Sequence, residues 1–472
     1  AGTLSRDVDK NMALSLGFEG SIDDVFLSAK DPILASITND GYKISPFIVR
    51  LGDGQIQSDL AMIKNEMRAK IVLEKLDLRP FIIFVPELPF TGLLDGKLLL
   101  NATPDAVDGE LALVLSSIRY SDDGELIDPD FTVSADGKLN KKGVKIVGVA
   151  RIIDLLDAQF SAELPLLIDA ESNHILLQDD QPLKGELVWQ GNLGPIWPFF
   201  DLVNHDLSGK VDTKLMVSGT IANPDINGHL RLAEGRYENL RTGFVAANID
   251  MASIILNRHF SLEHFTANDG GDGDITAEAT IDFNPDFTYQ ARGELNLSHA
   301  HLIRQPEIDV TASSNIILIK DASTTQISGD VTVENANVGA VTQGGPNIVD
   351  LEVREINSEG RETYNQETTS THIGPFNLDL KFTAPGKLFI RSYGIDSEWK
   401  AAINMSGTSD APIVAGSAEL IRGTFEFSGK RFALTNGTCI FPTDGSNDPI
   451  LDIRAEHKLV NFTAIIHITG RA

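Results

Sequence analysis

The chain has 472 residues, of which 42% are hydrophobic and 22% are charged, so it can bury a core and does not have the composition of a disordered protein. Its formal net charge of −28 predicts repulsion from nucleic acids and from anionic membrane surfaces. A single cysteine, Cys439, excludes an internal disulfide, and no apolar run approaches the roughly 20 residues that a membrane-spanning helix needs.

Apolar and polar residues alternate with a period of two along most of the chain, as in Gly228–Leu232 and Phe376–Phe382. This alternation predicts strands with one apolar and one polar face. The 40 glycines and 20 prolines indicate frequent turns between short elements. We expect a first group of strands over residues 1–70, a second over 71–190 and a third over 191–339.

Two short helices are predicted to interrupt the strands. One lies near residues 71–84, at the start of the second group and ahead of Pro80, and the other lies near residues 193–203, around Trp197. Each is followed by a glycine and a return to alternation, which predicts inserts or plugs in a sheet.

A glycine-initiated unit recurs in the sequence, with apolar residues at positions +2 and +4, Gly or Ala at +7 and an apolar residue at +9. A degenerate copy starts at Gly109. The four good copies are Gly228, Leu230, Leu232, Gly235 and Tyr237; Gly293, Leu295, Leu297, Ala300 and Leu302; Gly329, Val331, Val333, Ala336 and Val338; and Gly416, Ala418, Leu420, Gly423 and Phe425.

The spacing of this unit predicts a bent strand. Positions +2 and +4 share a face, whereas +9 has the opposite parity and would point away on a regular strand. An extra residue near the small residue at +7 would keep all three apolar side chains on one face, so strand bends are predicted at Gly235, Ala300, Ala336 and Gly423. A plain hairpin turn at +5 to +7 is the alternative.

Strands bent at the same place in successive copies would form a trough with an apolar lining. An ordinary closed core of a sandwich or β-helix is the other interpretation of the same apolar stripe. The predicted lining residues are Leu230, Leu232, Tyr237, Leu295, Leu297, Leu302, Val331, Val333, Val338, Leu420, Phe425 and Phe427.

The sequence offers no recognisable catalytic constellation. The 67 Asp and Glu residues are scattered, and nucleophile-elbow, phosphate-loop and dinucleotide-binding patterns are missing from the sequence. Cys439 on an apparent strand is interpreted as a small buried hydrophobe rather than a nucleophile. We therefore expect no catalytic residues, no cofactor and no enzymatic activity.

Two patches have metal-like composition. His299 and His301 could supply two ligands, and Asn268–Asp274 is similar to a calcium-binding glycine–aspartate repeat. No third ligand is evident near the histidines, and the acidic run is out of step with the calcium repeat. Solvated histidines and a turn are favoured, so no metal site is predicted.

Residues 340–372 lack apolar alternation and are rich in polar and turn-forming residues, which predicts a mobile polar loop. Residues 373–472 return to regular alternation and form the last predicted β domain.

Five blocks follow one another in this last domain: Gly386–Trp399, Met405–Thr408, Gly416–Phe427, Phe432–Phe441 and Pro449–Ala455. In this order they resemble the C-terminal domain of the TamB family of bacterial envelope proteins, whose AsmA-like relatives are repeating β-groove proteins. Residues from about 71 onward resemble the looser repeats of the same family.

The resemblance implies an all-β fold: an elongated, U-shaped (taco-like) repeating β-groove sheet with an apolar interior and a few short helices. It also implies the periplasm of a Gram-negative bacterium, an inner-membrane anchor formed by an N-terminal helix outside this sequence, and a TamA-like outer-membrane barrel protein as partner. The family offers no catalytic residues to carry over.

Three functions stay open at this point. The first is a bridge-like lipid transfer protein that shields phospholipid acyl chains in a continuous hydrophobic groove between the two membranes. The second is an assembly factor for outer-membrane β-barrel proteins and autotransporters that acts by β-strand addition. The third, a surface adhesin or carbohydrate-active β-helix with a sealed core, is disfavoured by the aromatic content of 7%.

Overall fold

The computed structural model describes residues 2–6, 11–22, 25–29, 31–81, 90–120, 131–169, 174–200, 202, 204–286, 288–321, 323–339, 375–445 and 447–471. The chain divides into two compact units. Unit 1 comprises residues 1–237, 248–265 and 282–288, and unit 2 comprises residues 238–247, 266–281 and 289–472. The segment boundaries predicted from the sequence stay a prediction, and the predicted polar loop at 340–372 lies outside the described residues.

The described residues of unit 1 form seventeen complete strands and two short 3₁₀ helices. They are β1 (Gly2–Arg6), β2 (Met12–Leu16), β3 (Glu19–Ile22), β4 (Val25–Ala29), β5 (Ile33–Thr38), β6 (Gly41–Leu51), β7 (Gly54–Ile63), β8 (Glu66–Asp77), η1 (Arg79–Phe81), β9 (Phe90–Ala102), β10 (Val107–Tyr120), β11 (Thr132–Asn140), β12 (Gly143–Ile152), β13 (Leu156–Leu164), β14 (Leu166–Asp169), β15 (His174–Leu177), β16 (Lys184–Asn192), η2 (Gly194–Phe200) and β17 (His205–Gly219).

Four further strands contribute residues to both units, and the remaining nine strands of the described part of the chain lie in unit 2. The four are β18 (Pro224–Asn239), β19 (Phe244–Leu256), β20 (His259–Asn268) and β21 (Asp274–Phe283). The nine are β22 (Tyr289–Arg304), β23 (Ile308–Lys320), β24 (Thr325–Gly339), β25 (Asn377–Ser392), β26 (Ile395–Thr408), β27 (Ala411–Phe427), β28 (Lys430–Phe441), β29 (Ile450–Lys458) and β30 (Thr463–Arg471).

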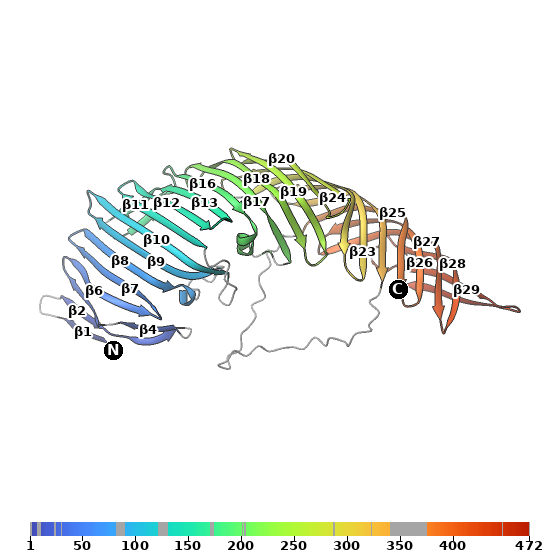
Figure 1. Cartoon of the computed structure of the whole chain (residues 1–472), viewed down its shortest axis with the longest axis horizontal. Helices are drawn as coiled ribbons and strands as arrows, with labels where there is room; N and C mark the ends of the chain where they lie inside the picture. Colours follow the sequence, from blue (N-terminus) through green and yellow to red (C-terminus); the bar gives the residue numbers. More distant parts are fainter. Residues whose placement is uncertain are drawn as a thin grey trace. The chain divides into compact units, whose positions relative to one another are not determined.

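Strands that follow one another in the sequence pair antiparallel over most of each unit. In unit 1, β6 to β13 pair in chain order, β13 continues to β16 and β16 to β17, as the adjacent blue and green strands of Figure 1 show. In unit 2, β22 to β30 pair in chain order, and only the β24–β25 pair among them is parallel. The chain between Gly339 and Asn377 supplies the length that a parallel connection needs.

The predicted all-β fold is confirmed, and no α-helix occurs among the described residues. None of the helices in the described part of the chain has the length and apolar character that crossing a lipid bilayer requires. The short helix predicted near residues 193–203 is present as the 3₁₀ helix η2.

The helix predicted near residues 71–84 is wrong for most of its described part. Residues 71–77 belong to strand β8, and only Arg79–Phe81 form a 3₁₀ turn. Leu73 and Leu76 have the i, i+3 spacing of a helix, but a β-bulge lies between them. Lys75 in this bulge has a left-handed backbone conformation, with φ of 47°. One inserted residue in a strand therefore produced a helix-like spacing.

Glycine at the first position of the recurring unit meets a steric demand. Gly329 has φ of 154°, and a Cβ atom there would lie 2.1 Å from the carbonyl oxygen of Asn315 on the neighbouring strand. Gly416 has φ of 141°, and its Cβ would lie 2.2 Å from the carbonyl oxygen of Ala402. Neither position has room for a side chain, which explains the glycine at the start of these two copies.

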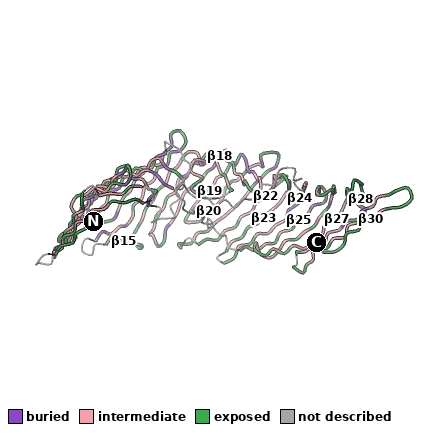
Figure 2. The backbone as a smooth tube through the Cα atoms, turned by 90° about the horizontal axis from the view of Figure 1, so that it is seen from below, coloured by how far each residue is buried: buried purple, intermediate pink, exposed green. Residues whose placement is uncertain are grey.

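Few side chains are completely buried. Most strand residues are intermediate in burial, with buried positions scattered among them, as Figure 2 shows. One buried cluster of unit 1 is formed by Ile118, Phe131, Ile152, Leu156 and Ala158. A single sheet with one apolar face accounts for this pattern, because each residue on that face is covered by its row neighbours but not by a second layer.

Candidate functional site

One face of the unit 1 sheet is apolar over strands β8 to β17. The strand registers place residues of successive strands opposite one another, and opposite residues share a face. One such row contains Leu73, Gly96, Leu113, Ala135, Gly148, Phe160, Leu187 and Leu215. A second contains Leu76, Leu94, Leu115, Val133, Ala150, Ala158, Trp189 and Thr213. We call these rows the apolar face of unit 1.

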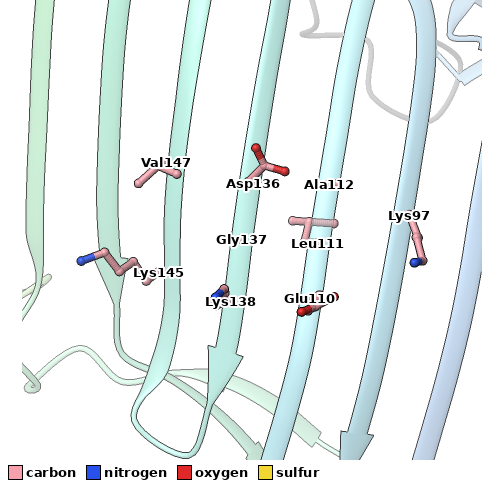
Figure 3. A pocket seen from close by; sticks show the side chains of 9 residues that line it. All are labelled: Lys97, Glu110, Leu111, Ala112, Asp136, Gly137, Lys138, Lys145 and Val147. Atoms are coloured by element: carbon pink, nitrogen blue, oxygen red, sulfur yellow. The ribbon is translucent and has the colours of Figure 1, made fainter.

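The opposite face of the same strands carries charges. One of its rows contains Leu99, Glu110, Lys138, Lys145, Glu163 and Lys184. Lys145 and Glu163 form a 2.7 Å ion pair across two strands. A hollow of about 540 Å³ lies on β9 to β12. Figure 3 shows the side chains that line it, among them Lys97, Glu110, Asp136, Lys138 and Lys145. These charged side chains distinguish the hollow from the cavity described next, whose surface has no polar atoms.

A cavity of about 430 Å³ lies on the apolar face of unit 1. Its surface is contributed entirely by apolar atoms. The lining residues are Phe90, Leu115, Ile118, Phe131, Val133, Ala150, Leu156, Ala158, Leu187, Trp189, Ile196 and Phe200. Strands β9 to β16 supply most of them, and η2 supplies the last two. Such a lining fits hydrocarbon and offers no partner to a polar ligand.

The 3₁₀ helix η2 packs onto the apolar face beside this cavity. Ile196 packs against the buried cluster that surrounds Ile118 and Leu156. The indole N–H of Trp197 donates a 2.8 Å hydrogen bond to the backbone carbonyl of His205, which fixes η2 to the start of β17. Phe200 lines the cavity and is still exposed to solvent. The element therefore has the position of the plug that the sequence predicted.

Unit 2 has an apolar face of its own. One row contains Leu295, Ile316, Gly329, Leu380, Met405 and Val414, and a second contains Leu297, Ser314, Val331, Phe382, Ile403, Gly416 and Phe441. The row on the opposite face contains Asn296, Asn315, Asp330, Lys381 and Asn404. The alternation in the sequence thus becomes one apolar and one polar face.

In unit 2, three copies of the recurring unit contain a β-bulge just before the small residue at position +7. Leu297 and Ala300 lie opposite Ser314 and Ala312, so two residues on β22 oppose one on β23. The registers of the Gly329 and Gly416 copies show the same extra residue. All four strands that carry the unit continue past this point, which excludes the alternative hairpin turn.

The bulge keeps positions +2, +4, +7 and +9 on one face. On β24, Val331, Val333, Ala336 and Val338 lie opposite Ser314, Ala312, Val310 and Ile308, which alternate along the regular strand β23. Leu420, Gly423 and Phe425 lie opposite Trp399, Ser397 and Ile395 on β26 in the same way. In the Gly293 copy a second irregularity follows, and Ile303 rather than Leu302 lies opposite Val310.

The predicted lining residues differ in burial. Leu232, Leu297 and Val331 are buried, and Val338 and Phe427 are exposed. The remaining ones, Leu230, Tyr237, Leu295, Leu302, Val333, Leu420 and Phe425, are intermediate. Contact of any of them with a ligand stays a prediction.

The small residues at the predicted bends are tightly packed. Ala300 and Ala336 are buried, and a Cβ on Gly235 would lie 2.9 Å from the Cβ of Ile249. A Cβ on Gly423 would lie 2.6 Å from that of Ser397. Small residues at +7 therefore leave space for a neighbouring strand.

The lining residues of the unit 1 cavity were missed from the sequence. The degenerate copy at Gly109 leads to Ile118 of the buried cluster, but Val133, Leu187 and Trp189 lie outside any copy. Alternation in β11 and β16 could have found them, since each of these strands alternates in the same way as the repeat copies.

The acidic, glycine-rich run is a turn, as the sequence predicted. The buried Asp269 carboxylate accepts hydrogen bonds from the backbone N–H groups of Gly271 (2.7 Å), Gly273 (3.1 Å) and His301 (2.9 Å). Burial alone would raise the pKa of Asp269, but these donors and the Arg304 guanidinium, 3.5 Å away, outweigh burial and hold the pKa below its usual value. Asp269 thus joins its own turn to β22.

The two histidines have separate carboxylate partners. His299 Nε2 lies 3.5 Å from Glu334, and His301 Nε2 lies 2.7 Å from Asp309. Among the described residues no group of His, Cys, Asp and Glu has the arrangement of a metal site.

Cys439 lies opposite Ala418 and Leu451 on the apolar face of unit 2. Burial raises the pKa of its thiol, which lowers the thiolate fraction and the nucleophilicity of the sulfur. This environment agrees with the interpretation of Cys439 as a small hydrophobe.

Comparison with known proteins gives one informative match. A search of curated proteins found no match to the chain. Residues 263–472 match the family model described as the TamB C-terminal domain. This range includes all five sequence blocks that carry the resemblance and continues upstream through β21 to β24. Residues 263–472 therefore match a TamB C-terminal domain, and this match supports a TamB-family role in the translocation and assembly module of the bacterial envelope.

Proposed function

We propose that this chain is a section of a non-catalytic track that holds phospholipid acyl chains during transfer between the inner and outer membranes. The observation that carries the proposal is the cavity on the apolar face of unit 1, whose surface is entirely apolar. The apolar rows of unit 2 support it, because they offer the same chemistry within the TamB domain.

The energetics of acyl transfer favour such a track. Moving one methylene from apolar surroundings into water costs roughly 0.8 kcal/mol. Transfer of a phospholipid with about 30 chain methylenes from the bilayer into water would therefore cost some 25 kcal/mol. A protein face as apolar as the bilayer makes each step along it nearly neutral. Passage of this kind needs a continuous apolar surface and no reacting group.

The proposal includes the cellular location of the protein and its protein partner. A transfer protein of the TamB family would act in the periplasm, and a TamA-like outer-membrane barrel protein would receive its far end. The family match is compatible with an assembly factor as well. The wholly apolar cavity favours lipid as cargo, since strand addition relies on backbone hydrogen bonds at a sheet edge.

Val133→Asp in the full-length protein is expected to lower the amount of co-purified phospholipid at least tenfold. Val133 lines the apolar cavity, where a carboxylate would be held among hydrocarbon at a cost of several kcal/mol to any bound acyl chain. Phospholipid is extracted from equal amounts of purified protein and quantified by mass spectrometry.

Ser134→Asp is the matched control, because Ser134 is the next residue on β11 and lies on the polar face. It should carry as much phospholipid as the unchanged protein. The proposal fails if the unchanged protein carries no phospholipid, or if both variants carry equal amounts. A co-purifying unfolded polypeptide in place of lipid would support the assembly-factor role instead.

A further inference from the structure

Three hairpin turns of unit 2 lie along one edge of its sheet. The β25–β26 hairpin closes at Ser392 and Ile395, the β27–β28 hairpin at Phe427 and Lys430, and the β29–β30 hairpin at Lys458 and Thr463. Antiparallel neighbours alternate in direction, so every second turn returns to the same edge. Neighbouring strands are about 4.8 Å apart, which separates successive turns on this edge by roughly 10 Å.

These turns expose large apolar side chains. Tyr393 is 90% exposed, Phe427 is 57% exposed and Phe462 is 64% exposed, and Leu459 and Val460 beside Phe462 are exposed as well. We call these five residues the aromatic rim. Exposed apolar side chains gathered at one edge mark a surface that another apolar phase covers.

The rim is positively charged within a strongly negative chain. Residues 426–431 and 457–462 contain Lys430, Arg431 and Lys458 but only one carboxylate, Glu426. In the described part of the chain none of these three cations forms an ion pair with a carboxylate. Their charges are therefore available to an anionic partner, in contrast to Lys145 or Lys400, which have Glu partners on the strands.

The opposite edge of the same sheet has the reverse character. Its turns are residues 321–324, 409–410 and 442–449, which contain Asp321, Asp410, Asp444 and Asp448 and no large apolar residue. Among the described hairpin turns of β25 to β30, the large exposed apolar residues therefore lie at one edge.

We propose that the aromatic rim of unit 2 docks onto an anionic phospholipid surface. Tyr and Phe side chains partition into the boundary between headgroups and hydrocarbon, and nearby lysines are attracted to anionic headgroups. The two interactions together provide the pair of weak signals that reversible membrane binding requires. The net charge of −28 opposes adsorption of the rest of the chain, so contact is confined to the rim.

The test is sedimentation of the full-length protein, solubilised and freed of its own lipid, with vesicles of phosphatidylethanolamine and phosphatidylglycerol or of phosphatidylcholine alone. Lys430→Gln/Lys458→Gln is expected to weaken binding to the anionic vesicles roughly tenfold or more, and to leave the weaker binding to phosphatidylcholine unchanged. Phe427→Ser/Phe462→Ser is expected to weaken binding to both kinds of vesicle.

Each double variant has a matched control. Lys381→Gln/Lys400→Gln removes the same charge from exposed positions on β25 and β26. Ile413→Ser/Ile440→Ser removes exposed apolar side chains near the opposite edge. Both controls should bind vesicles like the unchanged protein. The lysine variant changes only exposed side chains, so it decides the question if the phenylalanine variant fails to fold.

The proposal is overturned if the rim variants bind vesicles as the unchanged protein does, or if the controls weaken binding equally. Rim variants that bind vesicles normally but no longer retain an outer-membrane barrel protein would identify a protein interface instead. The inference is independent of the proposed cargo, because the cavity variant Val133→Asp should lose bound lipid and still sediment with anionic vesicles.

Discussion

Gly329→Ala is expected to destabilise unit 2 by about 3 kcal/mol or more and to lower its melting temperature by roughly 6 °C or more. A Cβ at this position would lie 2.1 Å from the carbonyl oxygen of Asn315 and 3.0 Å from the Cα of Ile316. Both atoms are backbone atoms of β23, so the clash is relieved only by moving a strand. The φ of 154° adds a conformation that L-residues rarely adopt.

Gly293→Ala provides the matched control for this prediction. Gly293 occupies the same position in its copy of the recurring unit, but a Cβ there would meet no heavy atom closer than the Glu278 carbonyl oxygen at 3.8 Å. Its stability should change by less than about 1 kcal/mol. Thermal melting followed by circular dichroism, with hydrogen exchange of β23 and β24 amides, compares the two variants. Equal melting temperatures would show that the repeat glycine has no steric role.

Leu380→Arg is expected to abolish lipid transfer in the full-length protein while leaving it folded. Leu380 is intermediate in burial and lies between Gly329 and Met405 in an apolar row of unit 2. Without a covering layer, the long arginine stem can carry its guanidinium to water, so the cost to stability should be limited to about 1–3 kcal/mol. A passing acyl chain would have to strip water from that charge.

Asn377→Arg is the control, since Asn377 lies on the same strand, faces the polar side and gains the same charge. Transfer of labelled phospholipid between donor and acceptor vesicles, measured together with melting, separates the two variants. Normal transfer by folded Leu380→Arg protein would contradict a track on this face. Unfolding of Leu380→Arg alone would indicate a sealed core.

Leu232 and Leu297, although predicted to line the trough, are unsuitable for the same experiment. Both are buried, so a charge at either position would be stranded and would destabilise the fold for a reason unrelated to transfer. Val333 is intermediate in burial and would serve as a second test position on β24.

The apolar face of each strand could be predicted because the spacing of apolar residues in the recurring unit indicates where the strand bends. Apolar residues at +2, +4 and +9 conflict in parity, and an inserted residue before +7 reconciles them, as the register at Ala336 shows. The same device misled the prediction near Leu73 and Leu76, where a bulge at Lys75 produced helical spacing without any repeat to reveal it. Periodicity alone does not separate these two cases.

Contacts between distant residues could not be predicted from the sequence. Alternation assigns a face to Val133 or Trp189, but only the register brings them into one row beneath η2. The aromatic rim forms because particular turns share an edge of the sheet. The Asp269 carboxylate accepts a hydrogen bond from the backbone N–H of His301, which is distant in the sequence. Side-chain spacing carries no information on such partners.

Site-specific photo-crosslinking tests the central claim most directly. A benzophenone side chain is introduced in the full-length protein in cells at Met405, in an apolar row of β26, or at Asn404, the preceding residue in a row of the opposite face. Illumination followed by mass spectrometry should give phospholipid adducts at position 405 and none at position 404. Equal adducts at both positions, or adducts with protein alone at position 405, would contradict an acyl-chain track on the apolar face.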